Sequence, residues 1–188
     1  MLGADAIGLV FYAASKRAVT VDSALPIRQA LPAFVSAVGL FVDPSREEVE
    51  SVLKHLHLDC LQFHGAESPE FCASFGLPYM KAIRVRDGLD LEAEIAAYAQ
   101  SSAILLDSFD QQAAGGTGRR FDWEIARRCV ATGSANIVLA GGLDPSNVSS
   151  AIEQVRPYAV DVSSGVESAA GVKCAQRLRA FFDEVRRV

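Results

Sequence analysis

An aspartate ends the most apolar short stretch of the sequence, AILLD at 103–107. A carboxylic acid at the rim of an apolar strand can act as a general acid, because it can donate a proton to a substrate held beside it. A helix cap or a loop hydrogen bond would use the same residue type. Asp107 is therefore a candidate catalytic acid, and the glycine-rich segment at 111–118 that follows it could close over a substrate.

Two glycine-bearing turns, each following an apolar run late in the sequence, could bind a phosphate group. They consist of Gly141 and Gly142, and of Ser163, Ser164 and Gly165. Glycine lets backbone N–H groups approach an anion closely, and a following helix adds partial positive charge. Tight turns without a ligand are the alternative interpretation, but phosphate sites of barrels often follow the last two strands.

Two further polar residues could contact a substrate, although each taken alone is weaker. Arg17 follows an apolar run and could hold a carboxylate in a two-pronged contact, unless it belongs to a solvated basic turn. His64 follows another apolar run and precedes a glycine, but a histidine at the edge of the core would look the same. His55 and His57 lie near Cys60 at a spacing that fits no familiar zinc site, so we expect no metal.

The elements that must position these residues alternate along the chain. Short runs rich in Val, Ile, Leu and Phe predict strands at 5–11, 36–42, 59–63, 79–85, 103–107, 136–140 and 159–163. They are nearly continuous in hydrophobicity, as in a parallel sheet covered on both faces. Amphipathic stretches predict helices at 45–56, 88–100, 121–131, 144–155 and 173–187. Ser45 and Glu48 form a capping-box pattern at the start of the first of these.

Alternating strands and helices indicate an α/β fold with a parallel sheet and right-handed crossovers. An open doubly wound sheet and a closed (β/α)8 TIM-type barrel compete. The barrel is favoured because it would gather the polar residues that follow many strands around one mouth. A barrel needs eight strands, and seven strand-helix units are seen. The opening residues Leu2 and Gly3 resemble a helix end, so we expect residues 1–188 to form a single barrel domain that lacks its first strand-helix unit.

Composition narrows the class of protein. The 188 residues are 50% hydrophobic and 22% charged, which is typical of a globular domain. The net charge of −5 argues against nucleic acid as a partner, and no apolar run suits a membrane partner. The N-terminus shows no leader pattern, and the four cysteines are scattered, which favours a cytoplasmic location.

The combined motifs resemble the phosphoribosylanthranilate isomerase family. The matching segments, in the order of the family, lie at 3–17, 38–43, 61–65, 105–108, 115–123, 139–148 and 156–167. The resemblance implies a (β/α)8 barrel that needs no metal or organic cofactor and performs the Amadori rearrangement of N-(5-phosphoribosyl)anthranilate in tryptophan biosynthesis. It implies a small phosphorylated substrate as the partner and a monomer or homodimer.

The resemblance also assigns roles to individual residues. Asp107 would be the general acid that opens the ribose ring, Arg17 would bind the anthranilate carboxylate, and His64 would line the substrate pocket. The two late turns would bind the phosphate.

One feature of the family has no counterpart in this sequence. The family's general base is a cysteine in a strand segment of the type K-I-C-G, and none of the four cysteines present stands in such a segment. We therefore expect little or no isomerase activity from the 188 residues alone. Two alternatives stay open: a non-catalytic phosphate-binding barrel, and another sugar-phosphate isomerase or epimerase barrel, although an epimerase would need more metal-ligand histidines at strand ends.

Overall fold

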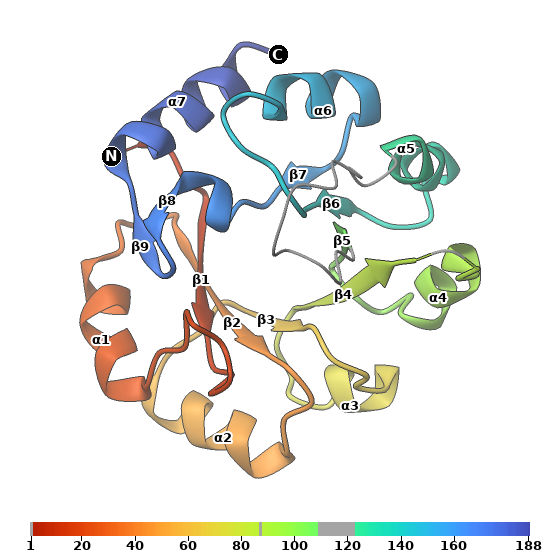
Figure 1. Cartoon of the computed structure of the whole chain (residues 1–188). Coiled ribbons are helices and arrows are strands. Elements are labelled where there is room, and N and C mark those ends of the chain that lie inside the picture. The colour runs from red at the N-terminus through yellow and green to blue at the C-terminus, as the bar shows by residue number, and fades with distance from the viewer. Residues whose placement is uncertain (1, 87, 109–122) are drawn as a thin grey trace. The chain divides into compact units, whose positions relative to one another are not determined.

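The computed structural model describes residues 2–86, 88–108 and 123–188 (Figure 1). They divide into two compact units. Unit 1 comprises Gly3–Ala82 and Gln100–Ser102, and unit 2 comprises Leu2, Ile83–Ala99 and Ala103–Val188. The predicted closing segment at 111–118 lies outside the described residues. In the part of the chain that is described, every helix is too short or too polar to cross a bilayer.

Unit 1 is built on parallel strands. These are β1 (Ala6–Val10), β2 (Ser36–Phe41), β3 (Cys60–Phe63) and the first part of β4 (Tyr79–Val85). Each pairs with the next in sequence, so that Val38 is level with Cys60 and Phe63 is level with Lys81. Consecutive parallel strands require a crossover after each one, and this explains why helices alternate with the strands.

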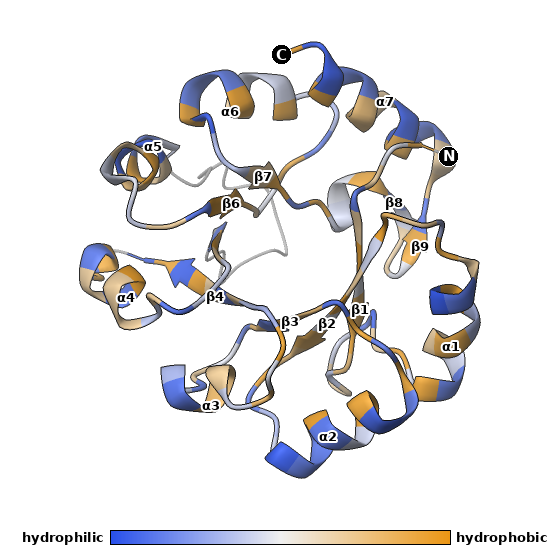
Figure 2. Cartoon of the chain, turned by 180° about the vertical axis from the view of Figure 1, so that it is seen from behind, coloured by the Kyte–Doolittle hydropathy of each residue, from blue (hydrophilic) through white to orange (hydrophobic). Residues whose placement is uncertain are grey.

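The helices of unit 1 are α1 (Val21–Ala30), α2 (Arg46–His55) and α3 (Pro69–Ala73). The predicted capping box is present on α2: the Glu48 N–H donates to the Ser45 Oγ over 3.2 Å, and the Ser45 N–H donates to the Glu48 carboxylate over 2.7 Å. Hydrophilic and hydrophobic residues alternate along α2 in Figure 2, and Val49 and Val52 are the ones that are buried.

Aromatic rings form much of the core of unit 1. Phe41 stacks on Phe11 with ring centroids 5.5 Å apart and lies 6.2 Å from Phe63. Phe63 in turn contacts the ring of Phe71, at 5.8 Å, and that of Phe75, at 5.9 Å. Because Phe63 is the last residue of β3, this packing holds the carboxyl end of the strand rigidly.

Unit 2 continues the same pattern. Its strands are β5 (Ala103–Ser108), β6 (Ile137–Leu139) and β7 (Ala159–Val160), and its helices are α4 (Leu91–Ala97), α5 (Trp123–Thr132), α6 (Val148–Val155) and α7 (Ala175–Arg186). The strand order of the sheet is β1-β2-β3-β4-β5-β6-β7, which confirms the seven predicted strands in sequence order. Helix α5 packs beside α6, and α6 packs beside α7.

A short insertion precedes α7 and was not predicted. A 3₁₀ turn, η1 (Ser164–Val166), leads into β8 (Glu167–Ala169), which pairs in antiparallel fashion with β9 (Val172–Lys173). Gly171 has a φ of 79° in the connecting turn. Such a two-stranded hairpin leaves little signal in the sequence, because its strands are too short for a hydrophobic period to be visible.

Several predicted bounds are wrong. The helix predicted at 144–155 begins at Val148, because a turn at Asp144 precedes it. The strand predicted at 159–163 ends at Val160. Helix α1 was not predicted, since Pro26 lies in its interior, where proline is normally unfavourable. The short α3 was also missed, although Ser68 caps it and proline occupies its first position.

Candidate functional site

Asp107 lies at the carboxyl end of β5. It follows Leu106, which is fully buried, and its own side chain is half-buried. Strand β5 pairs in parallel with β6, with Leu106 level with Leu139, and the Ala140 N–H donates to the Leu106 carbonyl over 2.9 Å. The carboxylate therefore stands at the end of the sheet where the turn after β6 begins.

The turn after β6 requires glycine for conformational reasons. Gly141 and Gly142 have φ values of 83° and 67°, in the left-handed region that other residues rarely adopt. The Asn147 side chain ties this turn to the start of α6, because it donates to the Gly142 carbonyl and accepts from the Asp144 N–H, each over 2.9 Å. The turn is thus held against a helix N-terminus, an arrangement that favours anions.

The second glycine turn packs directly against the first. It follows β7, whose next residue Asp161 donates its N–H to the Leu139 carbonyl over 2.9 Å. A Cβ on Gly165 would lie 2.9 Å from the carbonyl carbon of Leu143 and still closer to its oxygen, so only glycine fits. Within unit 2, both late turns and Asp107 therefore lie at the carboxyl ends of neighbouring parallel strands.

A cation that the sequence analysis missed lies beside the second turn. The Lys173 ammonium donates to the Ser163 carbonyl over 2.9 Å and pairs with the Glu167 carboxylate at 3.0 Å. Lys173 belongs to β9, so its position became visible only with the hairpin. Lys173 therefore ties β9 to the second turn, and Glu167 balances its charge.

Arg17 and His64 belong to unit 1. Arg17 lies in the loop after β1, which closes when the Val19 N–H donates to the Val10 carbonyl over 2.9 Å, and its side chain is half-buried. His64 directly follows β3, and its N–H donates to the Phe41 carbonyl over 2.9 Å. Both residues therefore follow the carboxyl ends of parallel strands of this unit.

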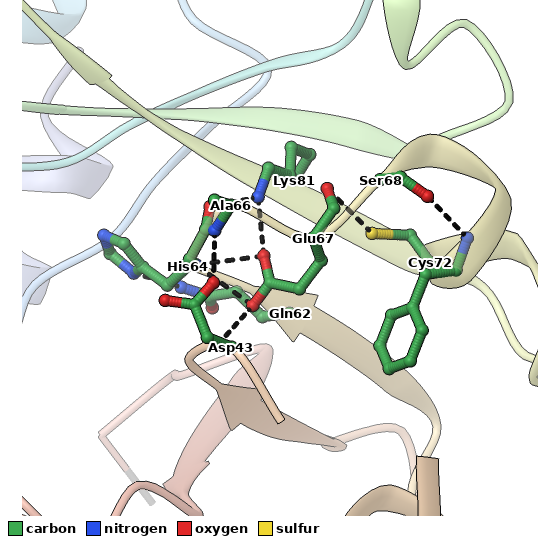
Figure 3. Close-up of polar contacts among 10 residues, drawn as sticks. Asp43, Gln62, His64, Ala66, Glu67, Ser68, Cys72 and Lys81 are labelled. Carbon is green, nitrogen blue, oxygen red and sulfur yellow. Dashed lines mark hydrogen bonds and ion pairs between the residues drawn. The ribbon is translucent and has the colours of Figure 1, made fainter. Parts of the chain in front are cut away.

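A buried ion pair next to His64 was also missed (Figure 3). Lys81 and Glu67 are both buried, and their charged groups are 2.7 Å apart. The sequence does contain a signal for this pair. Lys81 lies inside the apolar strand segment YMKAIRV, and a buried lysine needs a partner of opposite charge.

The four cysteines all lie within the described residues, and none stands at the carboxyl end of a strand of the parallel sheet. Cys60 begins β3, Cys72 and Cys129 lie in helices, and Cys174 precedes α7. Burial raises the pKa of the Cys60 thiol to about 11, which makes it a poor base at neutral pH. The described residues bring together no set of three or more His, Cys, Asp or Glu side chains that could hold a metal ion.

Known proteins resemble this chain over nearly its whole length. The family model described as N-(5'phosphoribosyl)anthranilate (PRA) isomerase matches residues 1–184. The N-(5'-phosphoribosyl)anthranilate isomerase of Pseudomonas fluorescens (strain SBW25) is 53% identical over 184 residues, which cover 98% of this chain and 86% of the relative.

Two solved structures are similar over the whole chain. Phosphoribosyl anthranilate isomerase from Thermotoga maritima is 38% identical with a TM-score of 0.89, and the match covers 100% of this chain and 90% of that one. An isomerase in complex with reduced 1-(o-carboxyphenylamino)-1-deoxyribulose 5-phosphate is 36% identical with a TM-score of 0.85, with the same coverage. These likenesses and the parallel strand order show an α/β fold of the TIM-barrel type. The chain belongs to the N-(5'-phosphoribosyl)anthranilate isomerase family.

Proposed function

We propose that this chain carries the substrate-binding and acid functions of an isomerase that rearranges N-(5'-phosphoribosyl)anthranilate in tryptophan biosynthesis. The isomerase assignment follows from the family. The observation that carries the proposal is in unit 2, where Asp107 stands at the same end of the parallel strands as two glycine turns. A sugar phosphate bound at those turns would have its ribose near the carboxyl group of Asp107.

The first chemical step needs an acid. Asp107 protonates the ring oxygen of the ribose, the bond between that oxygen and C1 breaks, and a Schiff base forms between C1 and the anthranilate nitrogen. Loss of the proton from C2 then gives the enol form of the aminoketose. The half-buried setting of Asp107 at the end of an apolar strand suits the acid step, because few water molecules compete for its proton.

Binding is assigned to other groups. The turns at 141–142 and 163–165 hold the phosphate through backbone N–H groups. Arg17 binds the anthranilate carboxylate, for which a guanidinium is the best-matched side chain, and His64 lines the pocket. No cofactor takes part in these steps, and the scattered cysteines favour a cytoplasmic enzyme.

The base for the second step is the part that these 188 residues do not supply. The position of all four cysteines away from the carboxyl ends of the parallel strands β1–β7 supports this part of the proposal. We expect a further strand-helix unit, carrying a cysteine at its strand end, to complete the enzyme.

The test compares two chains. The first is the 188-residue chain, and the second is the same chain preceded by a strand-helix unit that carries a cysteine at its strand end. We expect turnover of N-(5'-phosphoribosyl)anthranilate only from the second. In it, Asp107→Asn should reduce kcat by about 10²–10⁴-fold, because one proton transfer is lost, while calorimetry should show near-unchanged binding of the reduced product analogue.

Equal turnover by both chains would contradict the need for an added base. The second candidate, a non-catalytic phosphate-binding barrel, is favoured by the missing cysteine. It would be supported if both chains bound the analogue and neither turned over substrate.

A further inference from the structure

The loop that begins at His64 is held by a buried ionic network rather than by its own turn geometry. Lys81 lies in β4, level with Phe63 at the end of β3. Its ammonium donates to the Gly65 carbonyl over 2.5 Å and to the Glu67 carboxylate over 2.7 Å. The Lys81 and Glu67 side chains are only 5% and 2% exposed. Two charges removed from water to this extent cost free energy unless each finds several partners.

The Glu67 carboxylate finds those partners in the backbone of two loops. One oxygen accepts the Asp43 N–H over 2.8 Å, and both oxygens accept the Gly65 N–H, over 3.1 and 3.0 Å. Gly65 is thus held at both its N–H, by Glu67, and its carbonyl, by Lys81. Because Gly65 directly follows His64, this fixes the backbone on one side of the histidine.

The loop after β2 adds a second link. The Asp43 carboxylate accepts the Ala66 N–H over 2.5 Å. A Cβ on Gly65 would lie 2.6 Å from the Asp43 backbone nitrogen, so the two loops are in direct contact at a point where only glycine fits. The backbone on the other side of His64 is held as well, through the His64 N–H to Phe41 contact.

The imidazole of His64 points away from this network (Figure 3). Its Nδ1 lies 3.4 Å from the Gln62 amide nitrogen, and Gln62 itself is 7% exposed. The hydrogen bonds of Lys81 and Glu67 described above are therefore made to the backbone next to His64. Holding this backbone favours one position of the imidazole.

We propose that Glu67 and Lys81 are positioning residues, which fix His64 for contact with the substrate. The contact of His64 with substrate rests on the proposed function, whereas the positioning of His64 does not. A pair that served stability alone could be replaced by neutral groups of similar shape with little effect. A positioning pair could not, because the Gly65 carbonyl would lose the ammonium that holds it.

The experiment uses the 188-residue chain and the reduced product analogue. The chain has three histidines, so His64→Gln assigns the imidazole proton resonances of His64. Glu67→Gln and Lys81→Met each leave one buried charge without its partner, and both should lower the melting temperature. The double variant Glu67→Gln/Lys81→Met should recover much of that loss, because no unpaired charge remains.

The positioning role predicts that the double variant recovers its melting temperature but not the position of His64. In the double variant the His64 resonances should remain shifted or broadened, and binding of the analogue should remain about tenfold or more weaker, since small displacements of binding groups are costly. Asp59→Asn is the matched control. It removes a carboxylate from the amino end of β3, where Asp59 accepts the Ala37 N–H over 2.7 Å, and it should change neither His64 nor binding.

The outcomes separate the two proposals. If the double variant restores the His64 resonances as well as the melting temperature, the pair is structural and the inference is wrong. If the resonances change in the double variant but the double variant and His64→Gln both bind the analogue as tightly as the unchanged chain, positioning holds and the substrate role of His64 fails.

Discussion

At the scale of single residues, the four cysteines differ in whether their surroundings raise or lower the pKa of the thiol. Burial raises the pKa of Cys72 to about 12, above that of Cys60, and it also raises the pKa of Cys129. The pKa of Cys174 is lowered, chiefly because the Arg177 backbone N–H donates a hydrogen bond to its sulfur at the start of α7. A cysteine thiol is thus more acidic than usual at the start of α7 and less acidic than usual in the core.

These differences predict the order in which the thiols react. With N-ethylmaleimide near neutral pH, Cys174 should be labelled first, because its thiolate fraction is the largest and it is only half-buried. Peptide mass spectrometry at successive times would measure the order. In Cys174→Ser the fast phase should disappear, and a fast phase that survived on Cys72 would contradict the burial described for α3.

At the scale of elements, the two late turns are shaped in different ways, and the second depends on the first. The turn at 141–142 is shaped by left-handed glycines and by Asn147, whereas Gly165 is required by the approach of the Leu143 carbonyl from the other turn. The two turns therefore form one rigid structure, which a phosphate could bind without much reordering.

We expect Gly165→Ala to destabilise the protein by about 1–3 kcal/mol, because a methyl group there must push the Leu143 carbonyl aside. Chemical denaturation would measure this. Gly8→Ala in β1 is the control, since a Cβ there meets nothing within 4 Å, and its effect should stay within about 1 kcal/mol. An equal effect of the two substitutions would show that the turns are not packed as described. Analogue binding should weaken in Gly165→Ala only.

At the scale of the whole molecule, buried thiols couple stability to alkaline pH. The ordinary pKa of a thiol is 9.0, and the folded values for Cys60 and Cys72 are about 11 and about 12. Below pH 9 both states are protonated and this contribution is fully present. As the pH rises from 9 towards 11, the unfolded chain releases protons that the folded chain retains, so the free energy of unfolding falls.

The prediction is a loss of stability between about pH 8 and about pH 10.5 that is smaller in a Cys60→Ser/Cys72→Ala variant than in the unchanged chain. Urea unfolding at the two pH values would measure the difference. The double substitution should also lower stability at both pH values, because Cys72 is fully buried, but only the change with pH tests the coupling. A pH dependence identical in both proteins would rule out a contribution from these thiols.

Much of the fold was predictable because its signal is local. A nearly continuous apolar run marks each parallel strand, and the capping box of Ser45 and Glu48 marks the start of α2. The strand end that carries Asp107 was found in the same way. Prediction failed where the local signal was weak or misleading, as in α1 with its interior Pro26 and in the short strands β8 and β9, and it placed the end of β7 too late.

The sequence by itself determined the order of the strands and the residues that follow each one, since hydrophobic period and turn residues act over a few neighbours. Only the tertiary structure decided that Lys81 of β4 would neutralise Glu67 and that Gly165 would meet Leu143. These contacts join residues 14 and 22 positions apart in the chain, and they form only after the strands have paired and brought their carboxyl ends level. Their energies come from burial and distance, which no local pattern of residues records.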